Sequence, residues 1–294
     1  MQVQSGCLIR RLWDGATSLT NLADIIQYLE TIAPLDHALQ GELRGIQVGP
    51  QTKIEQSKTT INRVLIATYP SSRIAAMASQ DKANLVICYR PLFAAPISSL
   101  SGTDLVKVRL LSKNYISVYA ISSSFVGAQD GLSDALIQKL GLRNIRDFLS
   151  RGAKMDVVRA GAICTPPEET NHSGFANDIA TKLDISNVQF TGDLDADVNH
   201  LVVVAGNHFG EEDIYRAKEE GADTALTGEV IPGIRRLAHE KQLNLFEIPP
   251  FATENPGMNR LRHQLSLEFS DLKITYSESE SFTDFLRPYS ESMA

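Results

Sequence analysis

The chain has 294 residues, and its formal net charge at pH 7 is −7. That length suits one large domain or two medium ones, and an apolar fraction of 43% argues against wholesale disorder. The negative charge supplies no basic patch for gripping phosphate backbones, so we expect no direct nucleic-acid partner. No apolar run approaches the roughly 18 to 20 residues that cross a bilayer, so we also expect no membrane contact.

The compartment is indicated by the N-terminus and the cysteines. The first stretch, MQVQSGCLIRRLWDG, lacks the apolar core of a signal peptide. Cys7, Cys88 and Cys164 are odd in number and far apart, which fits neither a disulfide framework nor a zinc module. Both features favour a reducing cytoplasm.

In the first half, apolar runs alternate with amphipathic segments, which predicts α/β structure. We expect helices over 22–29, 73–81, 105–113 and 132–140, and buried strands over 64–68, 84–88 and 116–121. Gly41 to Pro50 is too rich in glycine for a helix interior and predicts a loop that runs into a short strand. Ser71 and Ser72 can cap the helix that follows them.

The second half begins near Lys154, and we place the boundary between residues 1–150 and 151–294. We expect strands over 157–164, 201–205, 224–227, 243–248 and about 273–276, and helices over 176–183, 212–220, 234–241 and from about 258. Thr165 to Ser173 predicts an exposed polar loop. The acidic, serine-rich tail from about residue 277 predicts a loose end.

The two halves repeat one pattern. VLIAT, helix, NLVIC, helix, ISVYAI is followed later by LVVVA, helix, DTALT, helix, LNLFEI. One constant offset aligns three residues of the first stretch with three of the second: Ala78, Ala83 and Asn84 with Ala217, Ala222 and Asp223. Apolar strands alternating with helices are typical of parallel sheets covered on both faces. We therefore expect two βαβαβ halves, although alternation alone occurs in any α/β chain.

Ligands of open parallel sheets bind beyond the carboxyl ends of the strands. That rule selects four stretches that follow predicted strands: 88–90, 122–126, 227–229 and 249–254. If the halves face each other, these four loops share one crevice.

At these four loops the sequence resembles the Nif-three-like family, whose members are also called GTP cyclohydrolase I type 2 homologues. The strongest matches are ANLVICYRPLF, GLSDALIQKLGL, GADTALTGEV and PPFATE, and the resemblance extends from about Leu22 to Phe269. It implies two interlocked α/β halves with mostly parallel sheets flanked by helices. It also implies a hexameric ring, a trimer of dimers, with paired metal ions in the cleft between the halves.

The resemblance also implies which positions would hold the metals. The family ligands come from a His-His-Pro motif, an Asp in a His-Thr-Asn-Leu-Asp motif, and a His and a Glu in a Gly-His-Tyr-Ala-Thr-Glu motif. The matching positions here are Tyr89, Arg90, Val126, Pro250 and Glu254, so only the glutamate survives. Divalent metals need imidazole, carboxylate or thiolate ligands, and arginine has no lone pair to offer. We expect no dinuclear metal site and no cofactor.

Two other arrangements remain open at these strand ends. Arg90 could form an ion pair with Glu254 that replaces the metal. A rebuilt site for zinc, iron or manganese would draw on five candidates: Cys88, His208, Glu229, Glu247 and Glu254. The sequence favours a core thiol for Cys88 and a surface loop for His208. It places the remaining histidines on loops or helix surfaces away from these ends: His37, His172, His200, His239 and His263.

Arg90 with the serine run Ser122, Ser123 and Ser124 makes a possible pocket for a small anion. The Gly206 to Gly210 turn also opens a helix, but three acidic residues follow it, so helix capping is the better interpretation.

Three functions follow from this pattern. The first is a family member that has lost the dinuclear metal site and acts as an oligomeric binding or regulatory protein. The second is a metal-dependent hydrolase of a nucleotide-like substrate with a weakened or rebuilt site. The third is a metal-free binder of small anions. We assign no catalytic residue, and the substitutions favour a protein that is not an enzyme.

Overall fold

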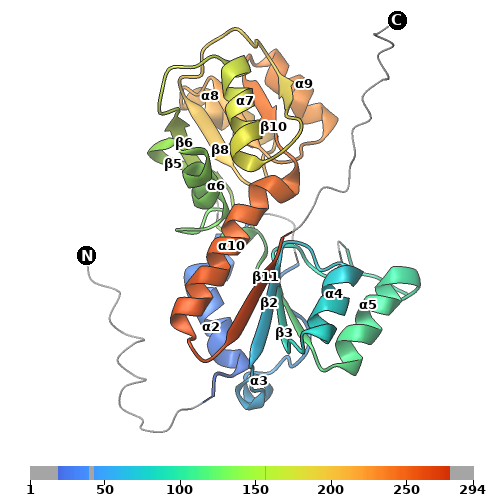
Figure 1. Cartoon of the computed structure of the whole chain (residues 1–294). Helices are drawn as coiled ribbons and strands as arrows, with labels where there is room; N and C mark the ends of the chain where they lie inside the picture. The colour runs from blue at the N-terminus through green and yellow to red at the C-terminus, as the bar shows by residue number, and fades with distance from the viewer. Residues whose placement is uncertain (1–18, 40–42, 94, 156, 279–294) are drawn as a thin grey trace, which may run out of the picture.

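The computed structural model describes residues 19–39, 43–93, 95–155 and 157–278 (Figure 1). Two sheets form the frame. The first has the strand order β1-β4-β3-β2-β11, and only β1 runs antiparallel to its neighbour. Its strands are β1 (Gly45–Val48), β2 (Arg63–Ala67), β3 (Leu85–Cys88), β4 (Ser117–Ala120) and β11 (Lys273–Ser277).

The second sheet has the order β5-β6-β8-β9-β10-β7. Its strands are β5 (Arg143–Arg151), β6 (Val157–Thr165), β7 (Gln189–Thr191), β8 (Leu201–Val204), β9 (Thr224–Thr227) and β10 (Asn244–Glu247). Only β8, β9 and β10 are mutually parallel, and the outer pairs are antiparallel. The prediction of mostly parallel sheets therefore holds for the first sheet and for the centre of the second.

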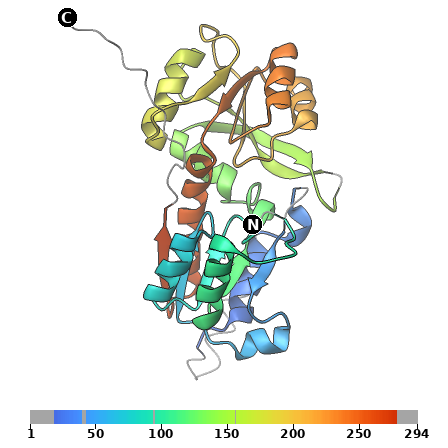
Figure 2. The same ribbon diagram turned by 90° about the vertical axis from the view of Figure 1, so that its right-hand side faces the viewer.

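Helices cover both sheets. Those of the first half are α2 (Leu22–Ile32), α3 (Lys53–Lys58), α4 (Ser72–Gln80), α5 (Gly102–Lys113) and α6 (Leu132–Leu140), with 3₁₀ turns η1 (Leu35–His37) and η2 (Ser122–Phe125). Those of the second are α7 (His172–Leu183), α8 (Glu211–Glu219), α9 (Pro232–Glu240) and α10 (Pro250–Glu268). In Figure 2, α7 lies on one side of the second sheet and α8 and α9 on the other. No helix within the described ranges has the length and apolarity needed to cross a membrane.

The central strands of the first sheet, β2, β3 and β4, are buried on both faces, as their continuous apolar runs predict. In β2, Leu65 and Ala67 pack in one core with α4 and α5, while Val64 and Ile66 belong to a second core that includes residues of α2 and α10. Successive side chains of a strand point to opposite faces, so a run without polar residues feeds both cores. The helix cap predicted at Ser71 is present, since its hydroxyl accepts a hydrogen bond from the Ile74 amide at 3.2 Å.

The internal repeat is also visible in the hydrogen bonds between side chains and backbone amides at the strand starts. The Asn84 Oδ1 accepts from the backbone amides of Asn62 and Arg63, at the start of β2. At the corresponding place, the Asp223 carboxylate accepts from the amides of Asn199 and His200, before β8. Each side chain ties the start of one strand to its parallel neighbour. The two βαβαβ units therefore share local design as well as element order.

Several segments depart from the prediction, and α3 and β7 were not predicted at all. α10 begins at Pro250 rather than near Met258, because Pro250 occupies the first helical position, where a missing N–H costs nothing. β5 was not predicted, and it spans the boundary proposed at residue 150. β11 joins the first sheet from the far end of the chain, so the two sheets do not correspond to two continuous halves.

His172 is a correction as well. The sequence predicts it on a loop or helix surface, but it is the first residue of α7 and 0% exposed. Its Nε2 lies 2.8 Å from the Thr224 hydroxyl, and its ring packs beside Phe190 and Phe246. The segment 166–171 before it is the loop expected there. The predicted loose tail lies outside the described residues beyond Glu278, as does Cys7, while Ser277 is the last residue of β11.

Candidate functional site

A polar cluster lies where the carboxyl end of β3 meets the carboxyl end of β8. Tyr89 and Arg90 follow β3 directly, and the Gly206 to His208 turn follows β8. The Tyr89 hydroxyl lies 2.8 Å from the His208 Nε2. The Arg90 Nη1 donates to the Asn207 Oδ1 at 2.8 Å. These contacts join the two sheets at the edge where the strand-end rule places a site.

Glu254 completes the cluster from the first turns of α10. Its carboxylate is 2% exposed and forms an ion pair with the Arg90 guanidinium. The Arg90 guanidinium carbon also lies 5.0 Å from the centroid of the Tyr89 ring. The ion pair between Arg90 and Glu254 that the sequence predicts is therefore present in the structure.

Gly206 lies at the centre of the cluster. Its amide donates to the Thr253 hydroxyl at 3.1 Å, and its carbonyl accepts from the Gly228 amide at 2.8 Å. Its φ of +79° is left-handed, and a Cβ there would lie 3.0 Å from the Tyr89 hydroxyl oxygen. Only glycine can adopt this left-handed conformation and also leave room for the Tyr89 hydroxyl. The turn after β8 thus belongs to the site, and not merely to the cap of α8.

The residues at the family ligand positions can be compared with what a metal requires. Val126 is fully buried in the main apolar core, and Pro250 is the first residue of α10. Neither has a side-chain donor atom, and Arg90 would repel a cation beside Glu254. The residues present therefore do not fit a dinuclear metal, and we derive no step through one.

The candidates for a rebuilt metal site are dispersed. Burial raises the pKa of the Cys88 thiol well above its usual range, which keeps it protonated in the apolar core, as the sequence predicts. Glu247 is engaged by Arg235, whose Nη2 donates to its Oε2 at 2.8 Å, and Glu229 is exposed. Only His208 and Glu254 lie in the cluster around Gly206. Within the described ranges, no three His, Cys, Asp or Glu side chains gather closely enough to hold a metal ion.

The possible anion pocket has fewer donors than the sequence suggests. Ser122, Ser123 and Ser124 are all buried in η2. The Ser123 hydroxyl donates to the Leu39 carbonyl at 3.2 Å, and the Ser124 hydroxyl to the Ile121 carbonyl at 3.0 Å. A hydroxyl has one proton to donate, so in this arrangement two of the three serines present only lone pairs to an anion.

Sequence reasoning missed Asn207 as a site residue and placed His208 on a surface loop. His208 is half-buried and bonds to Tyr89. The sequence pattern could have indicated both residues. β8 is parallel to β9, so the carboxyl ends of the two strands lie at the same edge of the sheet. In the second half, the prediction selects the stretches after the strands 224–227 and 243–248 but not the stretch after the strand 201–205.

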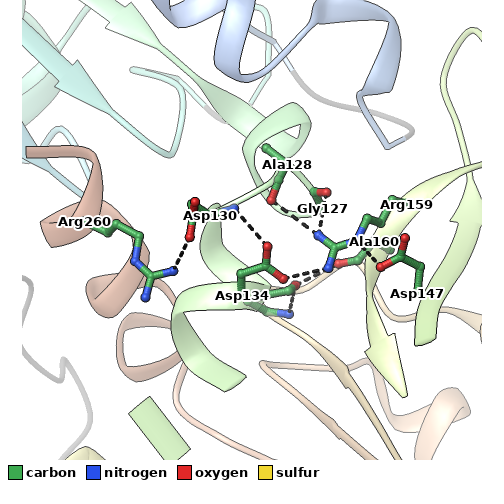
Figure 3. Close-up of polar contacts among 10 residues, drawn as sticks. Gly127, Ala128, Asp130, Asp134, Asp147, Arg159, Ala160 and Arg260 are labelled. Carbon is green, nitrogen blue, oxygen red and sulfur yellow. Dashed lines mark hydrogen bonds and ion pairs between the residues drawn. The ribbon is translucent and has the colours of Figure 1, made fainter. Parts of the chain in front are cut away.

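Arg159 of β6 holds the loop between η2 and α6 in place (Figure 3). Its Nη2 donates to the Asp134 Oδ1 and its Nε to the Asp147 Oδ1, both at 2.7 Å. Its Nη1 donates to the Gly127 carbonyl at 2.9 Å. A Cβ on Gly127 would lie 1.8 Å from the Arg159 carbonyl oxygen, so the loop can approach β6 only through a glycine.

The fold and the site define a two-sheet α/β protein whose polar cluster lies between the sheets. The sequence profile of the Duf34/NIF3 family (NGG1p interacting factor 3) matches residues 20–283. The chain belongs to this family, which confirms the resemblance drawn from its motifs.

Curated relatives and solved structures are consistent with this family membership. A protein of Methanocaldococcus jannaschii named "GTP cyclohydrolase 1 type 2 homolog" is 27% identical over 251 residues, which is 85% of this chain and 96% of that protein. One of Clostridium perfringens with the same name is 25% identical over 260 residues, 87% of this chain and 96% of its own. The structure of a Bacillus cereus protein related to NIF3 superposes with a TM-score of 0.79 at 18% identity, covering 92% of this chain and 100% of its own.

Proposed function

We propose that this protein is a family member without the dinuclear metal centre, and that it acts as an oligomeric binding or regulatory protein. The ion pair between Arg90 and the buried Glu254 carries the proposal. A cation that bound Glu254 would have to displace a guanidinium already seated on the same carboxylate. The other matching positions, Tyr89, Val126 and Pro250, supply no imidazole or carboxylate in compensation.

The assembly and the compartment are part of the proposal. A homo-oligomer, a hexamer by resemblance, is supported by membership of the family. A cytoplasmic location is supported by the odd number and wide separation of the cysteines.

Metal-dependent hydrolysis of a nucleotide-like substrate, which the relatives' printed name suggests, has less support. Its metal would need ligands that the described residues do not bring together. Binding of a small anion at Arg90 and the serine run has less support too, because the Ser123 and Ser124 hydroxyls already donate to backbone carbonyls.

Calorimetric titration of metal-stripped protein with zinc and with manganese tests the proposal. We expect no tight stoichiometric binding of either ion. Tight binding that disappears in Glu254→Gln would contradict the proposal, because it would place a metal at the carboxylate assigned to Arg90.

Restoring only the first two ligands should not restore the centre. We expect Tyr89→His/Arg90→His to bind zinc no more tightly than the unaltered chain, since Val126 and Pro250 still lack donor atoms. The control adds Val126→Asp and Pro250→His in the same background and should gain affinity if the backbone still has the family geometry. Tight binding by the double variant alone would reveal ligands outside the matched positions.

A further inference from the structure

We propose that the contacts of Tyr89 and Arg90 form a latch that fixes the first sheet against the second. The latch consists of three contacts: Tyr89 with His208, Arg90 with Asn207, and Arg90 with Glu254. The inference rests on the proposed function in one respect, because the latch occupies the cleft position that a metal would otherwise bridge.

The latch joins three elements through two adjacent side chains. Tyr89 and Arg90 extend from the end of β3 in the first sheet, whereas Asn207 and His208 extend from the end of β8 in the second. Glu254 adds α10, the helix that runs between the two sheets in Figure 1. A planar guanidinium that donates in two directions fixes orientation as well as distance.

Burial makes these contacts specific. The Tyr89 side chain is 0% exposed, and the Glu254 side chain is 2% exposed. When a buried polar group is separated from its partner, the free energy of the folded protein rises strongly, because no water molecule replaces the lost hydrogen bond. Sliding of one sheet past the other would therefore separate the part-buried Tyr89–His208 pair, together with the exposed hydrogen bond between Arg90 and Asn207.

The connecting segment between the sheets is already attached to the second sheet. Arg159 of β6 holds the Gly127 and Ala128 carbonyls and the Asp134 carboxylate (Figure 3). Arg260 of α10 donates to the Asp130 Oδ1 at 3.2 Å. The loop 127–130 and α6 are thus held to β6 and α10, and movement of the first sheet relative to them must strain the latch.

Other contacts also join the two parts: the Ala153 amide donates to the Ala38 carbonyl at 2.8 Å, and Leu39 forms an antiparallel bridge with Gly152. The Lys154 to Asp36 ion pair is more than half exposed on both sides, and exposed pairs contribute little. The Thr68 hydroxyl donates to the Asn255 Oδ1 at 2.9 Å, and this bond holds β2 to α10 rather than to the second sheet. Among the described side chains, Arg90 contacts both α10 and the second sheet.

Spin-label distance measurement on the full-length chain tests the latch. Labels on Gln80→Cys and Glu219→Cys, in a Cys7→Ser background, report the separation of α4 and α8. Both positions are exposed and lie at the ends of equivalent helices of the repeat, and the remaining cysteines, Cys88 and Cys164, are buried.

The test variant is Tyr89→Phe/Arg90→Met/Glu254→Gln, which removes the latch without leaving a buried charge unpaired. We expect its distance distribution to broaden and its maximum to shift, while the control Arg151→Met/Glu212→Gln keeps the parental distribution. The control removes an exposed ion pair within the second part of the chain. An unchanged distribution in the folded triple variant would overturn the latch.

If the triple variant does not fold, Tyr89→Phe/Asn207→Ala decides, because it removes only neutral partners. If that variant folds and its distance distribution equals that of the parent protein, the latch proposal is also overturned. Elemental analysis of the same samples keeps the two proposals apart. Bound metal would refute the proposed function whatever the distances are, and unchanged distances in metal-free protein would refute the latch alone.

Discussion

At the scale of single residues, Arg90 and Glu254 form an asymmetric couple. The carboxylate is almost fully buried, while the Arg90 side chain is 19% exposed. Removing the arginine therefore leaves an uncompensated buried charge, whereas removing both charges leaves a neutral contact. The energetic role of the pair is measured by comparing these two changes.

Arg90→Met should lower the free energy of unfolding by about 3–5 kcal/mol at neutral pH, because Glu254 loses its cation. Adding Glu254→Gln should recover most of that loss. Urea unfolding of both variants measures the difference. Arg151→Met is the matched control and should cost roughly 0–1 kcal/mol, since its partner Glu212 is exposed. Equal losses in Arg90→Met and in the double variant would contradict this assignment.

His172 is a second residue whose partners define its state. The Thr224 hydroxyl donates to the Asp223 Oδ1 at 2.6 Å, so its oxygen accepts from the His172 Nε2–H at 2.8 Å. The His172 Nδ1 has no hydrogen-bond partner among the described residues. Burial lowers the pKa of His172, and this effect outweighs the nearby Ala196 backbone and the charges of Asp223 and Asp193, which raise it. The histidine is therefore neutral in the folded protein at pH 7.

Because the unfolded chain binds the His172 proton more readily than the folded protein, this residue should reduce stability as the pH falls below about 6.5. We expect His172→Gln, whose amide can still donate to Thr224, to weaken the loss of stability between pH 7 and pH 5. Urea unfolding at several pH values gives the slope for each protein. Parallel slopes would show that His172 does not titrate differently on folding.

At the scale of elements, α10 shows what sequence patterns cannot supply. The Pro249-Pro250 pair and the Pro256-Gly257 pair both signal a break, and so the segment reads as a loop. In the structure, Pro250 fits the first helical position, and Gly257 lets α10 approach α6 closely. At this helix, tertiary packing outweighs local helix propensity. The neighbour that requires Gly257 is Leu132 of α6, and only the folded structure shows that contact.

Gly257→Ala tests that close approach. The added Cβ would lie 2.7 Å from the Leu132 Cα, so the helices must separate, and we expect a loss of about 1–3 kcal/mol. Gly233→Ala in α9 is the control, because its Cβ would meet nothing within 4 Å. Alanine favours a helix interior over glycine, so this variant should gain about 0.5–1 kcal/mol in its free energy of unfolding. Chemical unfolding measures both. A neutral Gly257→Ala would mean that the two helices adjust without cost.

β5 was missed for a related reason. Its sequence, RNIRDFLSR, shows no regular alternation, and two irregularities interrupt its pairing with β6. Such interruptions shift which side chains face the core, so a period of two cannot be read from the residues. The central parallel strands, by contrast, are continuous apolar runs bounded by turns, and all six were predicted within a residue or two.

At the scale of the whole molecule, the repeat and the site are connected. Each βαβαβ unit directs its strand ends towards the other, so a rule applied to two halves separately predicted where they meet. The pairing of Arg90 with Glu254 was predictable from the sequence. Asn207 was not chosen, and His208 was named only as a candidate metal ligand, because their partners come from β3, far away in the chain.

The family resemblance implies interlocked halves, but it does not say which strand crosses from one half to the other sheet. β11 pairs with β2 in parallel, with Ile274 opposite Val64, although more than two hundred residues separate them. Strand pairing over such a distance depends on which edge remains open once the rest has folded. The sequence predicts a strand near residue 273 but not the sheet that receives it.

The metal content of the purified protein tests the central claim most directly. Elemental analysis of full-length protein, produced in medium supplemented with zinc, iron and manganese, gives the stoichiometry per chain. The structure predicts far less than one equivalent of each metal, with no change in Glu254→Gln. One or two equivalents of a divalent metal per chain, lost in Glu254→Gln, would contradict the replacement of the metal centre by Arg90 and Glu254.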